Sequence, residues 1–255
     1  MSEELTAVLN NIIDTTEKYA LSHIKLDELT SQRLKNDAKR LIHINPSLTA
    51  MALGMIASVE GDFDECVKQH TQSLKLGKDP ILNLNYAISM KTLGHNAESF
   101  RLIDNAMNLL PDPGFAIPIY LMIAINAGKY ESIQSCEDML VNKGISIPPH
   151  LQQYFDDVNT IVTKAPLPFN MYPVIASIQE AISLNHKVGL TEYALEEKNN
   201  ELYLWTSVKA DPKTVTLMNI ELEDELSQLE HINLDDFHIA FRAKDMSISV
   251  NLDPS

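Results

Sequence analysis

The sequence predicts a mainly α-helical protein in which an N-terminal array of antiparallel helical hairpins precedes a small α+β domain. Three short motifs that begin with glycine recur at spacings of 33 and 34 residues: Gly61-Asp62-Phe63, Gly94-His95-Asn96 and Gly128-Lys129-Tyr130. After about residue 164, helical periodicity gives way to alternation of apolar and polar residues. We therefore expect a helical repeat domain over residues 1–163 and an acidic α+β domain over residues 164–255.

Each repeated glycine lies between two segments with helical periodicity. Glycine adopts the left-handed conformation at little cost, so it can end one helix and let the next fold back antiparallel. Around Gly61, we expect helices over residues 48–55 and 67–76. A second helical pair surrounds Gly94, and a third occupies about residues 115–141.

The first of these units has a recognisable pattern. The segment from Leu53-Gly54 to Gly61-Asp62-Phe63-Asp64-Glu65 resembles a tetratricopeptide repeat (TPR), whose pattern places Leu-Gly, then Gly-Asp-Tyr, then a small residue on the second helix. Small residues occupy the helix-crossing positions of two units: Cys66, Ser73, Ser99 and Ala106. The resemblance covers about residues 20–145. It implies a TPR-like stack of hairpins with a concave groove that binds another protein.

The same resemblance implies which side chains face the groove. They are Met51, Met55 and Ser58 in the first unit, Leu84, Asn85, Ile88 and Lys91 in the second, and Phe115, Met122 and Asn126 in the third. Because this lining is rich in Met and aliphatic residues and poor in cations, we expect an apolar helix or extended segment as the ligand. In the alternative, the protein's own N-terminal helix or C-terminal domain fills the groove, and these residues belong to the core.

The C-terminal domain is expected to mix helices with strands. Its first elements are an amphipathic helix over 172–185, a β-hairpin over 190–209, and a strand that enters a helix over 214–229. Residues 237–242 and 247–252 alternate around Ala243-Lys244-Asp245, which predicts a second β-hairpin.

Charge limits the classes of partner. The net charge of −15 argues against direct binding to nucleic acid or to an anionic membrane, since both require clustered Lys and Arg. Glu221, Glu223 and Asp224 belong to an acidic cluster that could bind a basic protein. The alternative is that this cluster is only the solvated face of a helix. We expect an adaptor, or a sequestering or inhibitory binding protein.

The alternative function is an enzyme whose active site lies in the C-terminal domain, with the repeats presenting the substrate. His231, Asp236 and His238 are its candidate catalytic residues. Their spacing fits no metal-binding motif, and the sequence contains no phosphate loop, dinucleotide fingerprint or nucleophile elbow. We therefore expect neither a metal nor a cofactor, and we favour binding over catalysis.

The remaining features concern location and assembly. The two cysteines, Cys66 and Cys136, form no C-x-x-C pair, and the N-terminus lacks the features of a signal peptide. The longest apolar run, residues 115–127, contains Pro118 and is too short to cross a bilayer. We expect a cytoplasmic protein that can self-associate through exposed repeat ends or hairpin edges.

Overall fold

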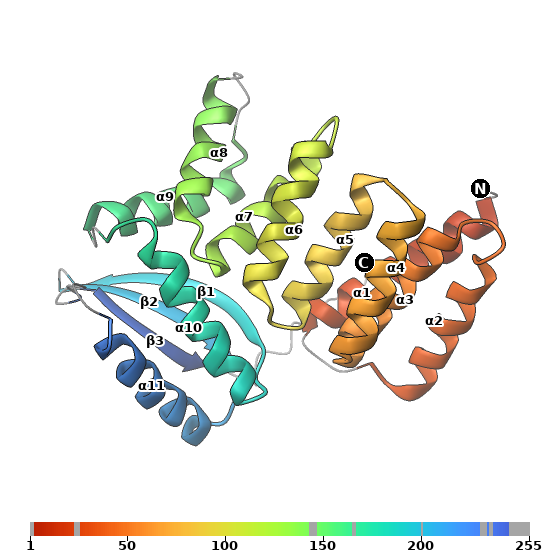
Figure 1. Ribbon diagram of the computed structural model, residues 1–255. Helices are drawn as coiled ribbons and strands as arrows, with labels where there is room; N and C mark the ends of the chain where they lie inside the picture. The colour runs from red at the N-terminus through yellow and green to blue at the C-terminus, as the bar shows by residue number, and fades with distance from the viewer. Residues whose placement is uncertain are drawn as a thin grey trace, which may run out of the picture. The chain divides into compact units, whose positions relative to one another are not determined.

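The chain is mainly helical, with a small three-stranded sheet in its C-terminal part (Figure 1). The computed structural model describes residues 3–22, 26–142, 147–164, 167–199, 201–229, 234 and 237–244. Two compact units are present, Met1–Ile123 and Ala124–Ser255, and their division falls inside helix α7 (Ile117–Asn126). The boundary that the sequence predicts lies later in the chain, between residues 163 and 164.

Helices of the first unit follow one another in pairs. Their bounds are α1 (Glu3–Ser22), α2 (Glu28–Arg40), α3 (Pro46–Glu60), α4 (Phe63–Leu76), α5 (Pro80–Thr92), α6 (Asn96–Leu109) and the short 3₁₀ helix η1 (Gly114–Ala116). An Asp or Asn side chain immediately before four of these helices accepts a hydrogen bond from a first-turn amide: Asp27, Asn45, Asp62 and Asp79. These caps fix where α2, α3, α4 and α5 begin.

The predicted glycine turns are confirmed. Gly61, Gly94 and Gly128 have φ angles of 79°, 86° and 64°, so all three adopt the left-handed conformation. At the first turn, the amide of Gly61 donates to the carbonyl of Ser58, which satisfies an acceptor at the end of α3. The chain can therefore begin α4 with only two residues, Gly61 and Asp62, between it and the end of α3.

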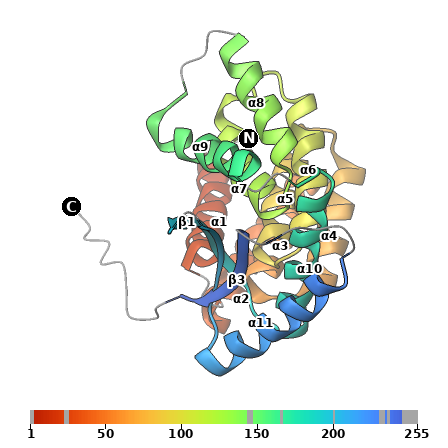
Figure 2. The same cartoon turned by 90° about the vertical axis from the view of Figure 1, so that its left-hand side faces the viewer.

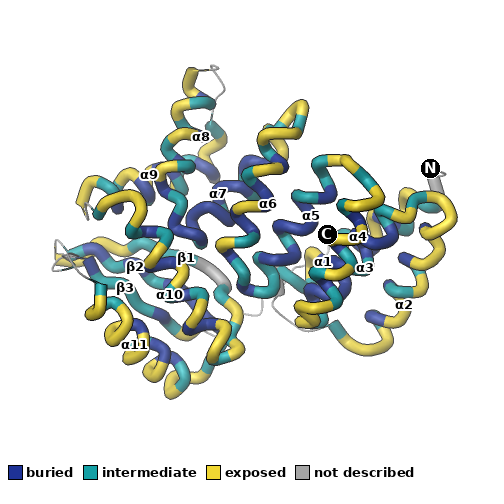
Figure 3. The backbone as a smooth tube through the Cα atoms, viewed as in Figure 1, coloured by how far each residue is buried: buried dark blue, intermediate teal, exposed yellow. Residues whose placement is uncertain are grey.

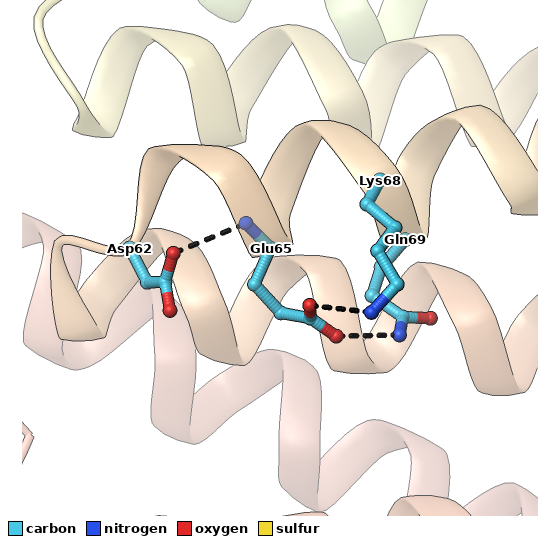
Figure 4. Close-up of polar contacts among 4 residues, drawn as sticks. All are labelled: Asp62, Glu65, Lys68 and Gln69. Atoms are coloured by element: carbon cyan, nitrogen blue, oxygen red, sulfur yellow. Dashed lines mark hydrogen bonds and ion pairs between the residues drawn. The ribbon is translucent and has the colours of Figure 1, made fainter.

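Polar contacts at the start of α4 reinforce this turn (Figure 4). The Asp62 carboxylate accepts from the Glu65 amide at 3.1 Å, and the Glu65 carboxylate accepts from Lys68 and Gln69 at 2.7 Å each. The hydrogen bond from Lys68 is the main cause of a lowered pKa at Glu65. Both acids also lie near the positive end of the helix dipole, which stabilises negative charge.

Helix α3 is the central element of the first unit and is buried along most of its length (Figure 3). Met51 and Met55 of α3 belong to one apolar cluster with Leu9 and Ile12 of α1. The N-terminal helix therefore packs on α3, as in the alternative in which these methionines belong to the core.

A buried histidine explains the Leu53-Gly54 pair. A Cβ atom at Gly54 would lie 2.5 Å from Cδ2 of His70, so only glycine leaves room for this ring. The His70 ring stacks on Tyr86 with centroids 4.7 Å apart, and its Nε2 lies 2.9 Å from Ser89 Oγ. Burial lowers the pKa of His70 to about 3, so the ring is neutral in the folded protein at neutral pH.

The second unit contains helices and all described strands. Its elements are α8 (Tyr130–Asn142), α9 (Pro149–Lys164), α10 (Met171–Asn185), β1 (Leu190–Lys198), β2 (Glu201–Val208), α11 (Pro212–Ser227) and β3 (Phe237–Ala243). The strand order is β1-β2-β3, with β1 antiparallel to β2 and β3 parallel to β2. A parallel neighbour requires a crossover, and α11 is that crossover.

The two faces of the sheet have different surroundings. Leu204 and Thr206 face α10, and the side chain of Gln179 in α10 donates to Thr206 Oγ1 at 3.0 Å. Since side chains alternate along a strand, Tyr203 and Trp205 lie on the opposite face. Within this unit, α10 lies on one side of the sheet and α11 lies along β3 (Figure 2).

The elements predicted for this unit are confirmed in part. The helix over 172–185 and the first hairpin are confirmed, but the strand expected at the start of 214–229 is wrong. Asp211 caps α11 and Pro212 occupies its first turn, so the whole segment enters a helix. Of the second predicted hairpin, β3 is confirmed, whereas residues 247–252 lie outside the described residues.

Replacement of His70 by Gln should reduce the loss of unfolding free energy that accompanies a change from pH 7 to pH 5. The unfolded chain takes up a proton at His70 below pH 6.5, whereas the native state holds the ring neutral down to about pH 3. The wild type should therefore lose about 2 kcal/mol of unfolding free energy between pH 7 and pH 5 that His70→Gln does not lose. Urea unfolding at both pH values measures this difference. Equal losses in the two proteins would show that His70 is protonated in the folded state.

Gly128→Ala should destabilise the second unit by about 2–4 kcal/mol. The new Cβ atom would lie 2.4 Å from the carbonyl oxygen of Tyr172, and the residue would keep a left-handed φ of 64°. Gly189→Ala is the matched control, because a Cβ atom there meets no atom within 4 Å. Its effect should stay within about 0.5 kcal/mol in thermal or urea unfolding. Equal effects at both positions would contradict the packing of Tyr172 on this turn.

Candidate interaction surface

An apolar wall and an acidic wall border one groove between α10 and α11. Val174, Ile178 and Ala181 of α10 line one side, and Glu221, Asp224 and Glu225 of α11 line the other. The volume of this groove, which we call the α10–α11 groove, is about 730 Å³. This volume falls within the range of about 300–1,000 Å³ that is typical of ligand pockets.

Helical spacing explains how the sequence builds each wall. Val174, Ile178 and Ala181 stand at i, i+4 and i+7, so they share one face of α10. Glu221 and Asp224 share a face of α11 with Leu217 by the same spacing. The walls meet because a separate stripe of α11 is buried with Ile182 of α10: Val215, Met218 and Leu222.

The walls of this groove are accessible and acidic. Glu221, Asp224 and Glu225 are exposed, Val174 is 38% exposed, and Leu217 on the same face of α11 is 47% exposed. No Lys or Arg is among the described residues that line the groove. His186 Nε2 lies 3.0 Å from Glu221 Oε1, which holds this carboxylate at the groove. The surface therefore favours a partner that is both apolar and positively charged.

Asn219 fixes α11 beside the open edge of the sheet. Its Nδ2 donates to the carbonyl of Phe241 at 3.0 Å, and the Phe241 amide donates to its Oδ1 at 2.7 Å. The side-chain amide thus replaces a neighbouring strand at this point of β3. This pair of bonds, together with the buried stripe, sets the direction in which the acidic wall faces.

The predicted acidic residues do not form one surface. Glu221 and Asp224 line the α10–α11 groove, whereas Glu223 lies on the opposite flank of the helix, beside residues of β2 and β3. At 100° per residue, neighbouring positions on a helix point in different directions, so a run of acids in the sequence divides between two flanks.

The residues predicted to line the repeat groove have different accessibilities. Met51, Met55, Ser58, Leu84 and Asn85 are buried in the free chain and offer no surface to a partner. Half-buried positions are Ile88, Lys91, Met122 and Asn126. Burial lowers the pKa of Lys91, and Asn126 lines an enclosed cavity of about 20 Å³, enough for about one water molecule. Phe115 is 56% exposed.

Of the candidate catalytic residues, only His238 is described. It lies in β3 and stacks on Tyr203 of β2, with ring centroids 4.7 Å apart. His231 and Asp236 lie outside the described residues. Within the described ranges, no three His, Cys, Asp or Glu side chains converge in a way that could hold a metal ion.

Two further observations concern the cysteines and the apolar character of the helices. Cys66 and Cys136 are both buried and unpaired by disulfides. Among the helices that the structure describes, none combines the length and the apolar character needed to cross a bilayer.

The apolar wall of the groove was not identified from the sequence. A signal for it existed, because Val174, Ile178 and Ala181 follow the spacing of one helical face. The sequence could not show that this face lies beside Glu221 and Asp224, which follow about 40 residues later across a β-hairpin.

Asn219→Leu should release the covered part of β3. The substitution removes both hydrogen bonds between Asn219 and Phe241. Because the loss of such a bond costs about 1–3 kcal/mol, the backbone amide of Phe241 should exchange with solvent at least about tenfold faster. Asn219→Asp is the matched control, because it retains an acceptor for the Phe241 amide. Hydrogen exchange followed by NMR distinguishes the two variants. Unchanged exchange at Phe241 in Asn219→Leu would contradict this role for Asn219.

No protein-family model, curated protein or solved structure matches this sequence.

Proposed function

We propose that this protein is a protein-binding module whose α10–α11 groove holds a basic amphipathic helix of its partner. One observation carries the proposal: an exposed apolar wall and an exposed acidic wall face each other across a single groove. A helix with Leu-like side chains on one face and Lys or Arg beside them would match both walls at once. An adaptor or a sequestering protein would use such a surface.

The two walls would contribute differently to binding. Apolar burial contributes about 25 cal/mol per Å², so contacts with Val174 and Ile178 would supply most of the affinity. Each ion pair with an exposed carboxylate adds only about 0.2–1 kcal/mol. The carboxylates would act mainly on the association rate and on the choice of partner, because the negative field attracts cationic proteins before contact.

The first unit supports a role as a scaffold. Its left-handed glycine turns, spaced by 33 residues within this unit, favour a TPR-like array, and we infer that the array presents accessible residues to the same partner. Ile88, Lys91, Met122 and Phe115 are the predicted groove residues left for this contact, because Met51 and Met55 are buried. The buried free thiols of Cys66 and Cys136 agree with a reducing, cytoplasmic setting.

Charge reversal in the groove tests the proposal. We expect the variant Glu221→Lys with Asp224→Lys to bind a fluorescein-labelled amphipathic Leu/Lys helix at least about tenfold more weakly than the wild type, because two attractions become repulsions. Fluorescence anisotropy measures the affinity, and 0.5 M salt should weaken wild-type binding as well.

The control variant carries the same change in net charge. Glu17→Lys with Asp138→Lys alters two exposed acids that do not line the groove. This protein should bind nearly as tightly as the wild type. If both variants lose affinity equally, the peptide responds to net charge alone, and the groove is not its site. Unchanged affinity in the groove variant would also reject the proposal.

A further inference from the structure

A second pocket lies on the opposite flank of α11 from the groove. Tyr203, Trp205, His238 and Ala240 of the sheet line it on one side, and Glu223 and Leu226 of α11 on the other; its volume is about 780 Å³. Among the residues that the structure describes, none lines both this pocket and the α10–α11 groove. A ligand here would therefore be recognised independently of a helix in that groove.

Aromatic rings form a row on the sheet side of this pocket. The rings of Tyr203 and Trp205 are nearly parallel, with centroids 5.9 Å apart and an interplanar angle of 10°. On the adjacent strand β3, the ring of His238 stacks on Tyr203. Trp205 is paired in register with Ala194 on β1 and Ala240 on β3. Because both neighbours are small, they leave space beside the indole that a larger side chain would fill.

Negative charge surrounds this row. Glu223 is exposed and lines the pocket, and Glu201 accepts the hydroxyl hydrogen of Tyr203 and lies 3.4 Å from His238 Nε2. Arg242 of β3, a cation on this face of the sheet, is held by Glu196 at 2.8 Å and Ser207 at 3.0 Å. No described Lys or Arg lines the pocket. An aromatic face beside unneutralised carboxylate is the arrangement that attracts a cation.

Hydrogen-bonding groups of the side chains and of the strand edge also lie at this pocket. The indole Nε1 of Trp205 is buried and makes no hydrogen bond. At the β3 edge, Asn219 binds the amide and carbonyl of Phe241, so the amide and carbonyl of Ile239, two residues earlier, point the same way. Ile239 also lines the pocket. The edge of β3 at Ile239 thus offers an amide donor and a carbonyl acceptor with which the backbone of a bound peptide can pair.

We propose that this pocket binds a Lys or Arg side chain of an extended peptide from a partner protein. The cation lies beside the Trp205 ring and close to Glu223, the aliphatic stem packs on Leu226 and Leu234, and the peptide backbone pairs with the edge of β3 at Ile239. The site adds an aromatic pocket for one basic side chain of an extended peptide, whereas the α10–α11 groove is proposed to hold a whole basic helix.

Trp205 supplies the readout, because it is the only tryptophan in the chain. We would titrate the full-length protein with the capped peptides Ala-Lys-Ala and Ala-Arg-Ala and follow Trp205 emission. Both should change the emission in a saturable way, with dissociation constants on the order of 1 mM, as expected for ligands this small. The norleucine and citrulline peptides, which keep the shape without the charge, should bind at least about fivefold more weakly.

Matched variants separate this pocket from the groove. Glu223→Gln should weaken the Lys peptide by about fivefold, and Glu225→Gln, which changes an acid of the α10–α11 groove on the same helix, should leave its binding unchanged. Ala240→Leu should abolish the response by filling the space beside Trp205, while far-UV circular dichroism and thermal unfolding verify that the variant is folded.

Three results would overturn the assignment. These are an absent emission change with both cationic peptides, an equal response to the neutral peptides, and equal losses in Glu223→Gln and Glu225→Gln. Because this titration contains no amphipathic helix, its failure would leave the proposed function of the α10–α11 groove standing, and failure of the groove experiment would leave this pocket standing.

Discussion

The burial of one stripe of α11 is the interaction on which both candidate surfaces depend. Val215, Met218 and Leu222 pack with Ile182 of α10 and Phe241 of β3. Once this stripe is fixed, one flank of the helix faces α10, the other flank faces the strand edge, and the outer positions face solvent. Acidic residues adjacent in the sequence are thereby assigned to two different sites, each with its own apolar or aromatic wall.

In the first unit, glycine residues determine how closely neighbouring helices approach each other. Gly61 and Gly94 have left-handed backbones that let consecutive helices fold back, and Gly54 makes room for the ring of His70 between helices. None of these glycines contributes a side chain to a core. Each allows larger neighbours to approach, which is why a repeat of glycine positions identifies a repeat of helical hairpins.

Much of the fold could be predicted because its signals are local. The turn glycines, the helix over 172–185 and the hairpin β1–β2 follow from backbone preference and periodicity. The start of α11 was misassigned because Val215 and Leu217 suit a strand equally well, and the capping contribution of Asp211 and Pro212 decided between the two.

The candidate sites were less predictable because they join segments distant in the sequence. Glu221 and Asp224 were identified by their charge, but their apolar counterpart on α10 depends on tertiary packing. Met51 and Met55 show the opposite limit, because a repeat pattern assigns them to an open groove, whereas both are buried in the described structure. In this chain Leu9 and Ile12 of α1 share their cluster, and no pattern within α3 contains that information.

The central claim is that recognition resides on α11 and its neighbour α10, and the location of bound peptide tests it most directly. We would record amide chemical shifts of the ¹⁵N-labelled protein while adding the basic amphipathic helix. The account predicts that the largest changes fall on residues 173–185 of α10, on residues 217–227 of α11 and on Gln228, which follows α11. Changes concentrated on α3 and α5, with α10 and α11 unaffected, would contradict it and assign the interaction to the helical hairpins.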